Sequence, residues 1–219
     1  MQIDLTFATA AIYPFLLLLL VVKSPFKYVW EMFAGAPVNQ VPADGRGLNP
    51  LLQNFWMELH PPVLFIGFAA MAVPFRFAVA ALWRRNYQEW VTQAFAWVLF
   101  AVCSLGMGLM LGAYWAYGVL GWGGYWGWDP VENSSLVPWI TATALIHTML
   151  VQRRSGKFVR TNVALATVSF FLVIYSTFLT RSGILGDASV HSFSDPGTAV
   201  YGLLIVYLAS IILLGFGMM

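Results

Sequence analysis

The sequence predicts an all-α protein that crosses a membrane about six times and carries an external tryptophan-rich loop. Of its 219 residues, 60% are hydrophobic and only 9% are charged, whereas a typical soluble domain carries about 25% charged residues. The apolar residues fall into long runs separated by short polar segments. One polar segment, GWGGYWGWDPVENSS at 121–135, also gathers three tryptophans and a tyrosine among four glycines.

A helix needs about 20 apolar residues to cross the hydrocarbon core of a bilayer. Six segments meet this requirement: 3–22, 62–82, 91–112, 136–152, 162–180 and 198–217. The first lacks the basic start and cleavage site of a signal peptide, so we expect it to stay as a membrane span. We interpret residues 1–219 as one membrane domain, and the abrupt, apolar ends suggest a piece of a larger protein or one product of a split gene.

Lysine and arginine predict the orientation of the spans, because short basic loops stay on the cytoplasmic side. The connections 83–90 and 153–161 carry six basic residues, and we expect them in the cytoplasm. The external parts are then the loop 23–61, the tryptophan-rich segment 113–135 and the loop 181–197, which carry four.

A polar residue precedes proline at four external positions, a pattern typical of helix starts because Asn or Asp caps the helix and proline fits its first turn. The four pairs are Asn49-Pro50, His60-Pro61, Asp129-Pro130 and Asp195-Pro196. Asp129 and Glu132 also have the spacing of a capping box, so we expect Asp129 to start a helix. Pro138 is expected to separate a short interfacial turn from the span that follows.

Two of the three histidines lie on the predicted external side, His60 before the tryptophan-rich segment and His191 after it. An isolated histidine is usually a packed or capping residue. Two imidazoles that flank an aromatic surface, however, suit the axial positions of a flat metallo-macrocycle. His147 lies inside the fourth span, where an ionisable residue indicates a functional site or a hydrogen bond to a neighbouring helix.

The tryptophan-rich segment has two interpretations. Trp and Tyr favour the membrane–water interface, so the segment could be an anchoring belt. The density of Trp122, Trp126 and Trp128 exceeds what anchoring needs, and the glycines between them allow a flat ligand to approach closely. A porphyrin suits such a surface because π-systems stack on aromatic faces, and a lipid or a quinone is the competing ligand. Cys103 stands alone without a C-x-x-C-H motif, so the chain carries no c-type haem of its own.

The stretch WGGYWGWDPVENSSLVPW, at 122–139, resembles the tryptophan-rich signature of haem-handling membrane proteins. Its Asp-Pro-Val-Glu-Asn form resembles the CcmF branch, the haem lyase subunits of bacterial system I cytochrome c maturation. The stretches PADGRGLNPLLQNFWMELHPP at 42–62 and TFLTRSGILGDASVHSFSDPGTA at 177–199 resemble the two external histidine regions of that family. The resemblance therefore covers most of the chain.

The resemblance implies a set of site residues. His60 and His191 match the two external histidines that hold haem at the tryptophan-rich surface. His147 matches an intramembrane histidine that helps to hold haem b, and its second ligand would come from a region outside this chain. The residues expected to bind cofactor are His60, His191, His147, Trp122, Trp126, Trp128 and Asp129, with the three histidines as iron ligands.

The resemblance also implies a function. The chain would hold haem b at the outer face of the bacterial inner membrane while the haem vinyl groups are joined to the C-x-x-C-H cysteines of apocytochrome c. Its residues suit a positioning role within a haem lyase and supply no acid–base pair. The implied partners are apocytochrome c, a haem chaperone, other maturation subunits and membrane lipid, and nothing indicates nucleic acid.

Two other functions remain open at this point. The first is a haem transporter or exporter of the same superfamily. The second is an assembly subunit that docks a haem chaperone and binds no haem itself.

Overall fold

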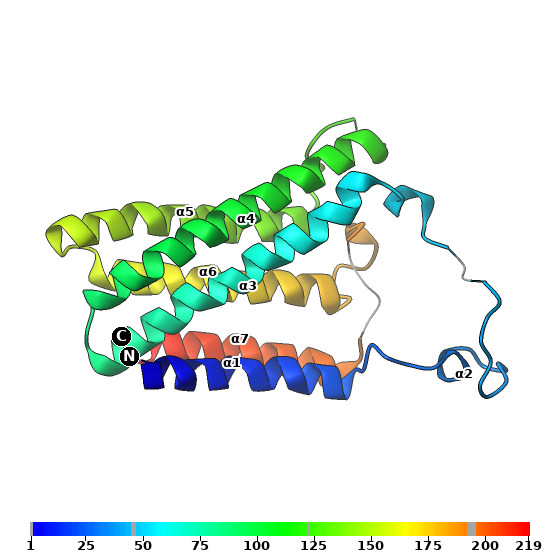
Figure 1. Cartoon of the computed structure of the whole chain (residues 1–219), viewed down its shortest axis with the longest axis horizontal. Helices are drawn as coiled ribbons and strands as arrows, with labels where there is room; N and C mark the ends of the chain where they lie inside the picture. Colours follow the sequence, from blue (N-terminus) through cyan, green and yellow to red (C-terminus); the bar gives the residue numbers. More distant parts are fainter. Residues whose placement is uncertain (1, 45–46, 122, 192–195) are drawn as a thin grey trace.

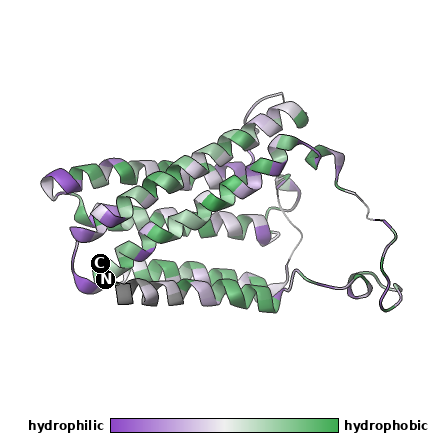
Figure 2. Ribbon diagram, in the orientation of Figure 1, coloured by the Kyte–Doolittle hydropathy of each residue, from purple (hydrophilic) through white to green (hydrophobic). Residues whose placement is uncertain are grey.

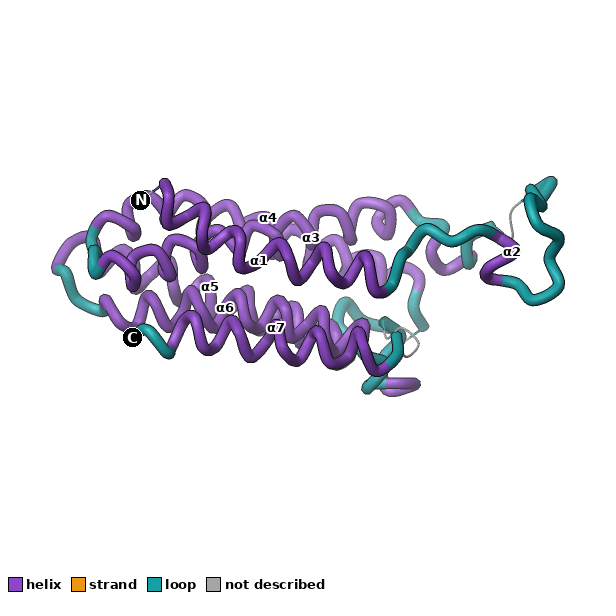
Figure 3. The backbone as a smooth tube through the Cα atoms, turned by 90° about the horizontal axis from the view of Figure 1, so that it is seen from below, coloured by secondary structure: helices purple, strands orange, loops and turns teal. Residues whose placement is uncertain are grey.

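The computed structural model describes residues 2–44, 47–121, 123–191 and 196–219, and within these ranges it consists of helices and loops without strands (Figure 3). The long helices are α1 (Gln2–Val22), α3 (Phe55–Arg84), α4 (Glu89–Val119), α5 (Pro130–Ser155), α6 (Val159–Arg181) and α7 (Thr198–Phe216). Shorter elements are α2 (Val29–Met32) and two 3₁₀ turns, η1 (Pro50–Leu52) and η2 (Gly186–Ala188). Figure 1 shows the long helices gathered in one elongated bundle. The predicted all-α membrane fold is confirmed.

Five helices, α3 to α7, are long and apolar enough to cross a membrane. Within the described part of α1, the apolar stretch is shorter and covers Ile12–Val22. The helices α3 and α4 contain 30 and 31 residues, which corresponds to about 45 Å at 1.5 Å per residue. Because the hydrocarbon core is about 30 Å thick, the ends of α3 and α4 extend beyond it.

The start of α3 differs from the prediction. The helix begins at Phe55, so the connection after α1 is 23–54 rather than 23–61. Asn54 caps α3, with its side-chain oxygen accepting from the Trp56 N–H at 2.9 Å. The expected helix start at His60-Pro61 is therefore wrong. Prolines inside membrane helices are tolerated because neighbouring helices and side chains compensate for the missing N–H.

The other helix starts agree with the prediction more closely. Asn49 caps η1 and Asp129 caps α5, and Asp129 forms the expected capping box with Glu132. Asp195 lies outside the described residues. The expected break at Pro138 is wrong: α5 is continuous from 130 to 155, and Pro138 is buried. Contacts with the neighbouring helices outweigh the cost of an interior proline, which is about 3 kcal/mol.

The helices pack in pairs, α3 along α4 and α5 along α6. Two glycines allow α3 and α4 to approach closely. A Cβ atom on Gly67 would lie 2.7 Å from the Leu105 Cα, and one on Gly108 would lie 2.7 Å from the Leu64 Cα. Small residues of this kind are what membrane helices use to bring their backbones together.

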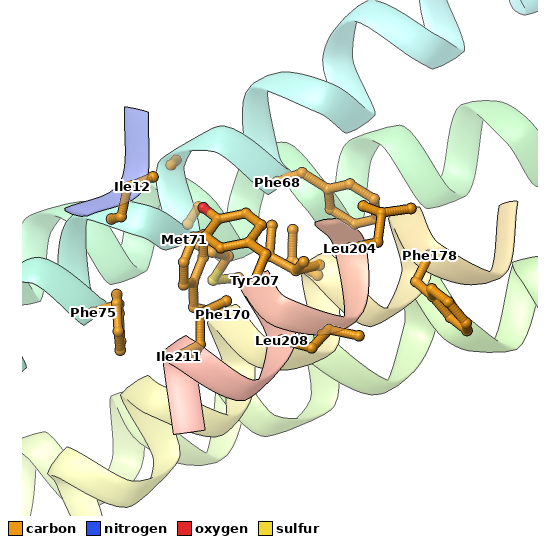
Figure 4. Close-up of a cluster of buried hydrophobic side chains, with 14 of the residues drawn as sticks. Ile12, Phe68, Met71, Phe75, Phe170, Phe178, Leu204, Tyr207, Leu208 and Ile211 are labelled. Carbon is orange, nitrogen blue, oxygen red and sulfur yellow. The ribbon is translucent and has the colours of Figure 1, made fainter. Parts of the chain in front are cut away.

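A buried apolar cluster joins α3 and α6 to α1 and α7 (Figure 4). Phe75 of α3 stacks on Phe170 of α6 with ring centroids 4.9 Å apart, and Tyr207 of α7 stacks on Phe15 of α1 at 4.8 Å. The cluster fixes α6 against α3, and both helices contribute residues to the wall of the cavity described below.

The loops separate into two sets at opposite ends of the bundle (Figure 1). The hydrophilic α3–α4 and α5–α6 loops lie at one end, together with the start of α1 and the end of α7 (Figure 2). The segment that contains α2 and the described parts of the α4–α5 loop and of the α6–α7 connection lie at the other end. The segments predicted to be external therefore share one end, which we call the external end; its location outside the cytoplasm stays a prediction.

Candidate haem-binding site

A cavity of about 440 Å³ lies at the external end of the bundle, and both predicted external histidines line it. Its volume falls within the range of about 300–1,000 Å³ that is typical of small-molecule sites. The walls come from η1, α3, α4, α5, α6 and the two external loops, and they are mostly apolar. The lining residues used below are His60, Gly112, Trp115, Trp126, Glu132, Arg181 and His191.

His60 lies in the second turn of α3 with its ring against α4. Nδ1 is 2.7 Å from the Gly108 carbonyl oxygen. A carbonyl oxygen can only accept, so Nδ1 carries the proton and donates it. The Nε2 atom of the neutral ring consequently keeps a lone pair, as a metal ligand requires.

Gly112 leaves the space that the His60 ring occupies. A Cβ atom at this position would lie 2.5 Å from Cε1 and 2.7 Å from Nδ1 of His60. Gly108 and Gly112 are four residues apart and share one face of α4. One glycine thus brings the carbonyl close enough for the hydrogen bond, and the next makes room for the ring.

His191 enters the cavity from the α6–α7 connection. Its Nδ1 lies 3.2 Å from Oδ1 of Asp129, whose side chain is 6% exposed. An ionised carboxylate can only accept, so Nδ1 again donates, and in a neutral ring Nε2 would keep a lone pair. The two residues are 62 positions apart in the sequence.

Asp129 joins the start of α5 to the segment that carries His191. Its Oδ1 accepts from the Val131 N–H at 2.8 Å and from the Ser189 hydroxyl at 2.8 Å, and Oδ2 accepts from the Val190 N–H at 3.1 Å. Burial acts to raise the pKa of the Asp129 carboxyl. The hydrogen bonds from Ser189 and Val131 and the nearby His191 outweigh burial and lower that pKa below its ordinary value. Asp129 is therefore a helix cap and the partner of His191 at once.

The predicted tryptophans have different environments. Trp126 lines the cavity and donates from Nε1 to Oδ1 of Asn133 at 3.3 Å. Trp128 is 75% exposed and is not among the cavity-lining residues. Trp122 lies outside the described residues. Of the predicted aromatic surface, Trp126 is the described tryptophan that reaches the cavity.

The prediction missed Trp115, which is 5% exposed and forms part of the cavity wall. Its ring meets the His191 ring edge-on at 6.3 Å, and its Nε1 donates to the Leu51 carbonyl at 3.0 Å. The signal in the sequence is the spacing from Gly112, since residues three apart share a helix face.

Two charged side chains also line the cavity. Arg181, the last residue of α6, supplies a guanidinium group. Glu132 supplies a carboxylate whose Oε2 already accepts from the N–H groups of Gly127 and Asp129, at 3.0 and 3.2 Å. Of the two, Arg181 suits an anionic ligand, because a guanidinium group pairs with carboxylates in a bidentate geometry.

His147 is not part of this cavity. It lies on α5, is exposed on the surface of the bundle and is not among the cavity-lining residues. A partner for its ring would have to come from outside the described residues or from another chain.

These side chains fit haem better than a bare metal ion. Among the described residues, no three His, Cys, Asp or Glu side chains gather as a metal site. Haem brings four nitrogen ligands of its own and needs only axial ligands from the protein. The cavity offers two imidazoles whose Nδ1 atoms are held by hydrogen bonds, as is usual for histidines that bind metals. The cavity also has apolar and aromatic walls, which suit the porphyrin ring, and one guanidinium group, which suits a propionate.

Comparisons with known proteins identify relatives of the chain. A family profile described as "Cytochrome C assembly protein" matches residues 2–185. The cytochrome c-type biogenesis protein CcmF of Pseudomonas fluorescens is 44% identical over 192 residues, which is 87% of this chain and 28% of that protein. CcmF of Escherichia coli (strain K12) is 41% identical over 189 residues, which is 85% of this chain and 28% of that protein.

A solved structure described as "Cytochrome c Heme Lyase CcmF" matches with a TM-score of 0.55 and 40% sequence identity. The match covers 76% of this chain and 29% of the solved chain. The present chain thus spans less than a third of the length of these relatives. His60 and Asp129 lie inside the range matched by the family profile, and His191 lies just beyond it.

Proposed function

The chain belongs to the cytochrome C assembly protein family, and we propose that it is the haem-holding part of a cytochrome c haem lyase. It is a multi-pass membrane protein with bacterial relatives. In this proposal the external end of the bundle lies on the periplasmic side of the inner membrane. The shared lining of one cavity by His60 and His191 is the observation that carries the proposal.

The two histidines would hold the haem iron. Each Nδ1 is engaged in a hydrogen bond, which orients the ring and leaves Nε2 for the metal. When bound, haem supplies the iron that the histidines ligate and the vinyl groups to which cysteines of apocytochrome c are joined. The chain's own part in this reaction is to bind and orient.

The walls of the cavity support the same function. Trp115 and Trp126 offer aromatic surfaces against which a porphyrin can stack. Arg181 would pair with a haem propionate, and the apolar residues of α3 and α4 would exclude water from the ring. Apocytochrome c, a haem chaperone and other maturation subunits are the partners that this function requires.

His147 would take part in a different haem site within the membrane. Its position on an exposed face of α5 agrees with a ligand shared with a further helix. We propose that it would help to hold an intramembrane haem b, with a second ligand from outside this chain.

Haem titration of the purified chain tests the proposal. A His147→Ala background removes the third histidine, so that the Soret absorbance reports only the external cavity. We expect haem to bind in this background, and binding to be lost when His60 and His191 are both changed to Ala. An unaltered Soret band in that triple variant would refute the assignment.

The same experiment separates the other two functions. A chain that binds no haem in any background but co-purifies with a haem chaperone is an assembly subunit. A chain that binds haem and accumulates it outside the membrane, without any effect on attachment to apocytochrome c, is a haem exporter.

A further inference from the structure

The two histidines of the cavity have unequal hydrogen-bond partners. Nδ1 of His60 donates to a neutral backbone carbonyl, that of Gly108, at 2.7 Å. Nδ1 of His191 donates to a carboxylate, that of Asp129, at 3.2 Å. The difference in charge gives the two rings different strengths as metal ligands.

The carboxylate has the greater effect in spite of its longer distance. Coulomb energy varies with the inverse of distance, so the additional 0.5 Å weakens an interaction by about a sixth. A carboxylate carries a full negative charge, whereas a carbonyl carries only a dipole. A carboxylate partner raises the basicity of a metal-bound imidazole. His191 therefore donates more electron density through Nε2 than His60 does.

Both acceptors are shared with other donors. Gly108 lies in the interior of α4, where its carbonyl accepts the intrahelical bond from the N–H of the residue four positions later. Asp129 Oδ1 also accepts from the Val131 N–H and the Ser189 hydroxyl, and Oδ2 accepts from the Val190 N–H, so the carboxylate is held on the same segment as His191. His191 is thus fixed by a charged group that is itself fixed.

We propose that Asp129 is a positioning residue that makes His191 the stronger and retained iron ligand. His60 is then the weaker ligand, the one that an incoming imidazole replaces. This inference rests on the proposed function and adds a direction to it: a protein substrate that brings its own histidine approaches the His60 side of the cavity.

A double-mutant cycle tests the coupling between Asp129 and His191. Haem affinity is measured by Soret titration in the His147→Ala background, with His60→Ala or His191→Ala added. We expect Asp129→Asn to weaken haem binding about 10- to 100-fold when His191 is the remaining ligand, the usual cost of losing such a partner. When His60 is the remaining ligand, the change should be within about twofold. Equal losses in both cases, or no loss in either, would overturn the proposal.

Asparagine is the informative replacement because it caps helices about as well as aspartate and removes the charge, with the loss of one acceptor, the oxygen that receives the Val190 N–H. Glu132→Gln is the matched control: it removes the carboxylate that lines the cavity, whereas Asp129 stands behind His191, and glutamine can still complete the capping box. With both histidines present, Asp129→Asn should raise the midpoint potential of the bound haem by more than Glu132→Gln does, because only Asp129 acts through a ligand. Equal shifts would show that only the net charge of the cavity matters.

The outcomes distinguish this inference from the proposed function. If the His147→Ala chain binds no haem, both fail. If it binds haem through His60 and His191 but Asp129→Asn behaves like Glu132→Gln, the proposed function stands and the inference fails.

Discussion

A methyl group added at Gly112 tests whether α4 positions the ring of His60. The new Cβ atom would lie 2.5 Å from Cε1 of His60, whereas ordinary contacts begin near 3.4 Å. Separation of α3 from α4 would break their close packing at Gly108, so the helices resist it. The ring must therefore withdraw by about 0.9 Å.

This displacement breaks the hydrogen bond of the His60 ring. The bond from Nδ1 to the Gly108 carbonyl is 2.7 Å long, and a shift of this size takes it beyond the usual limit of about 3.2 Å. The loss of one neutral hydrogen bond costs about 1 kcal/mol, and a misplacement of about 1 Å at a site can cost about 100-fold. We expect Gly112→Ala to weaken haem binding about 10- to 100-fold.

Soret titration of the Gly112→Ala chain in the His147→Ala background measures this effect. Gly118→Ala is the matched control, because Gly118 lies on the same helix and a Cβ atom there meets nothing within 4 Å. Alanine also favours a helix over glycine by about 0.5–1 kcal/mol, so a loss of affinity cannot come from a weaker α4. Equal affinities of the two alanine variants would refute the reasoning.

Further predictions concern the cap of α5, the end of the bundle opposite the cavity, and the tryptophans. Asp129→Ala should lower the free energy of unfolding by about 1 kcal/mol or more, and Asp129→Asn by less, in denaturant titrations. The pKa of Asp129 is lower in the folded protein than in the unfolded chain. The ionised carboxylate should therefore stabilise the fold fully above its unfolded pKa of about 3.9, and this stabilisation should be lost as pH falls through the lower folded value. Melting curves at several pH values would detect the loss. Gln152→Leu should cost about 1–3 kcal/mol in the same titrations, because it leaves the buried Asn162 amide without its 2.7 Å partner; a neutral effect would contradict this. Trp126→Ala should weaken haem binding in Soret titrations and Trp128→Ala should not, and equal effects would argue against the cavity as the haem site.

The sequence predicted the helices well in their apolar centres and less well at their ends. Hydropathy detects the part of a helix that crosses hydrocarbon, so it misses turns such as 55–61 that continue α3 into a polar region. The proline rule then indicated a start at Pro61, although Asn54 provides the cap. The proline rule also predicted a break at Pro138, but α5 continues through it. Contacts between helices outweigh the free-energy cost of an interior proline, and a sequence does not reveal those contacts.

The sequence also indicated which external residues to consider, because counting spans assigns His60 and His191 to one side. It could not indicate the partners of these histidines. The bond from His60 to Gly108 depends on the rotation of α4 against α3, and the bond from His191 to Asp129 joins residues 62 positions apart. For the same reason composition alone could not separate Trp126, which reaches the cavity, from the exposed Trp128.

The most direct test of the central claim is the electron paramagnetic resonance spectrum of ferric haem bound to the His147→Ala chain. If His60 and His191 are axial ligands of one haem, the spectrum should be low-spin, as is usual for two imidazoles. It should become high-spin when either histidine is changed to Ala and return to low-spin when imidazole is added. A low-spin spectrum that persists after both changes would contradict the account.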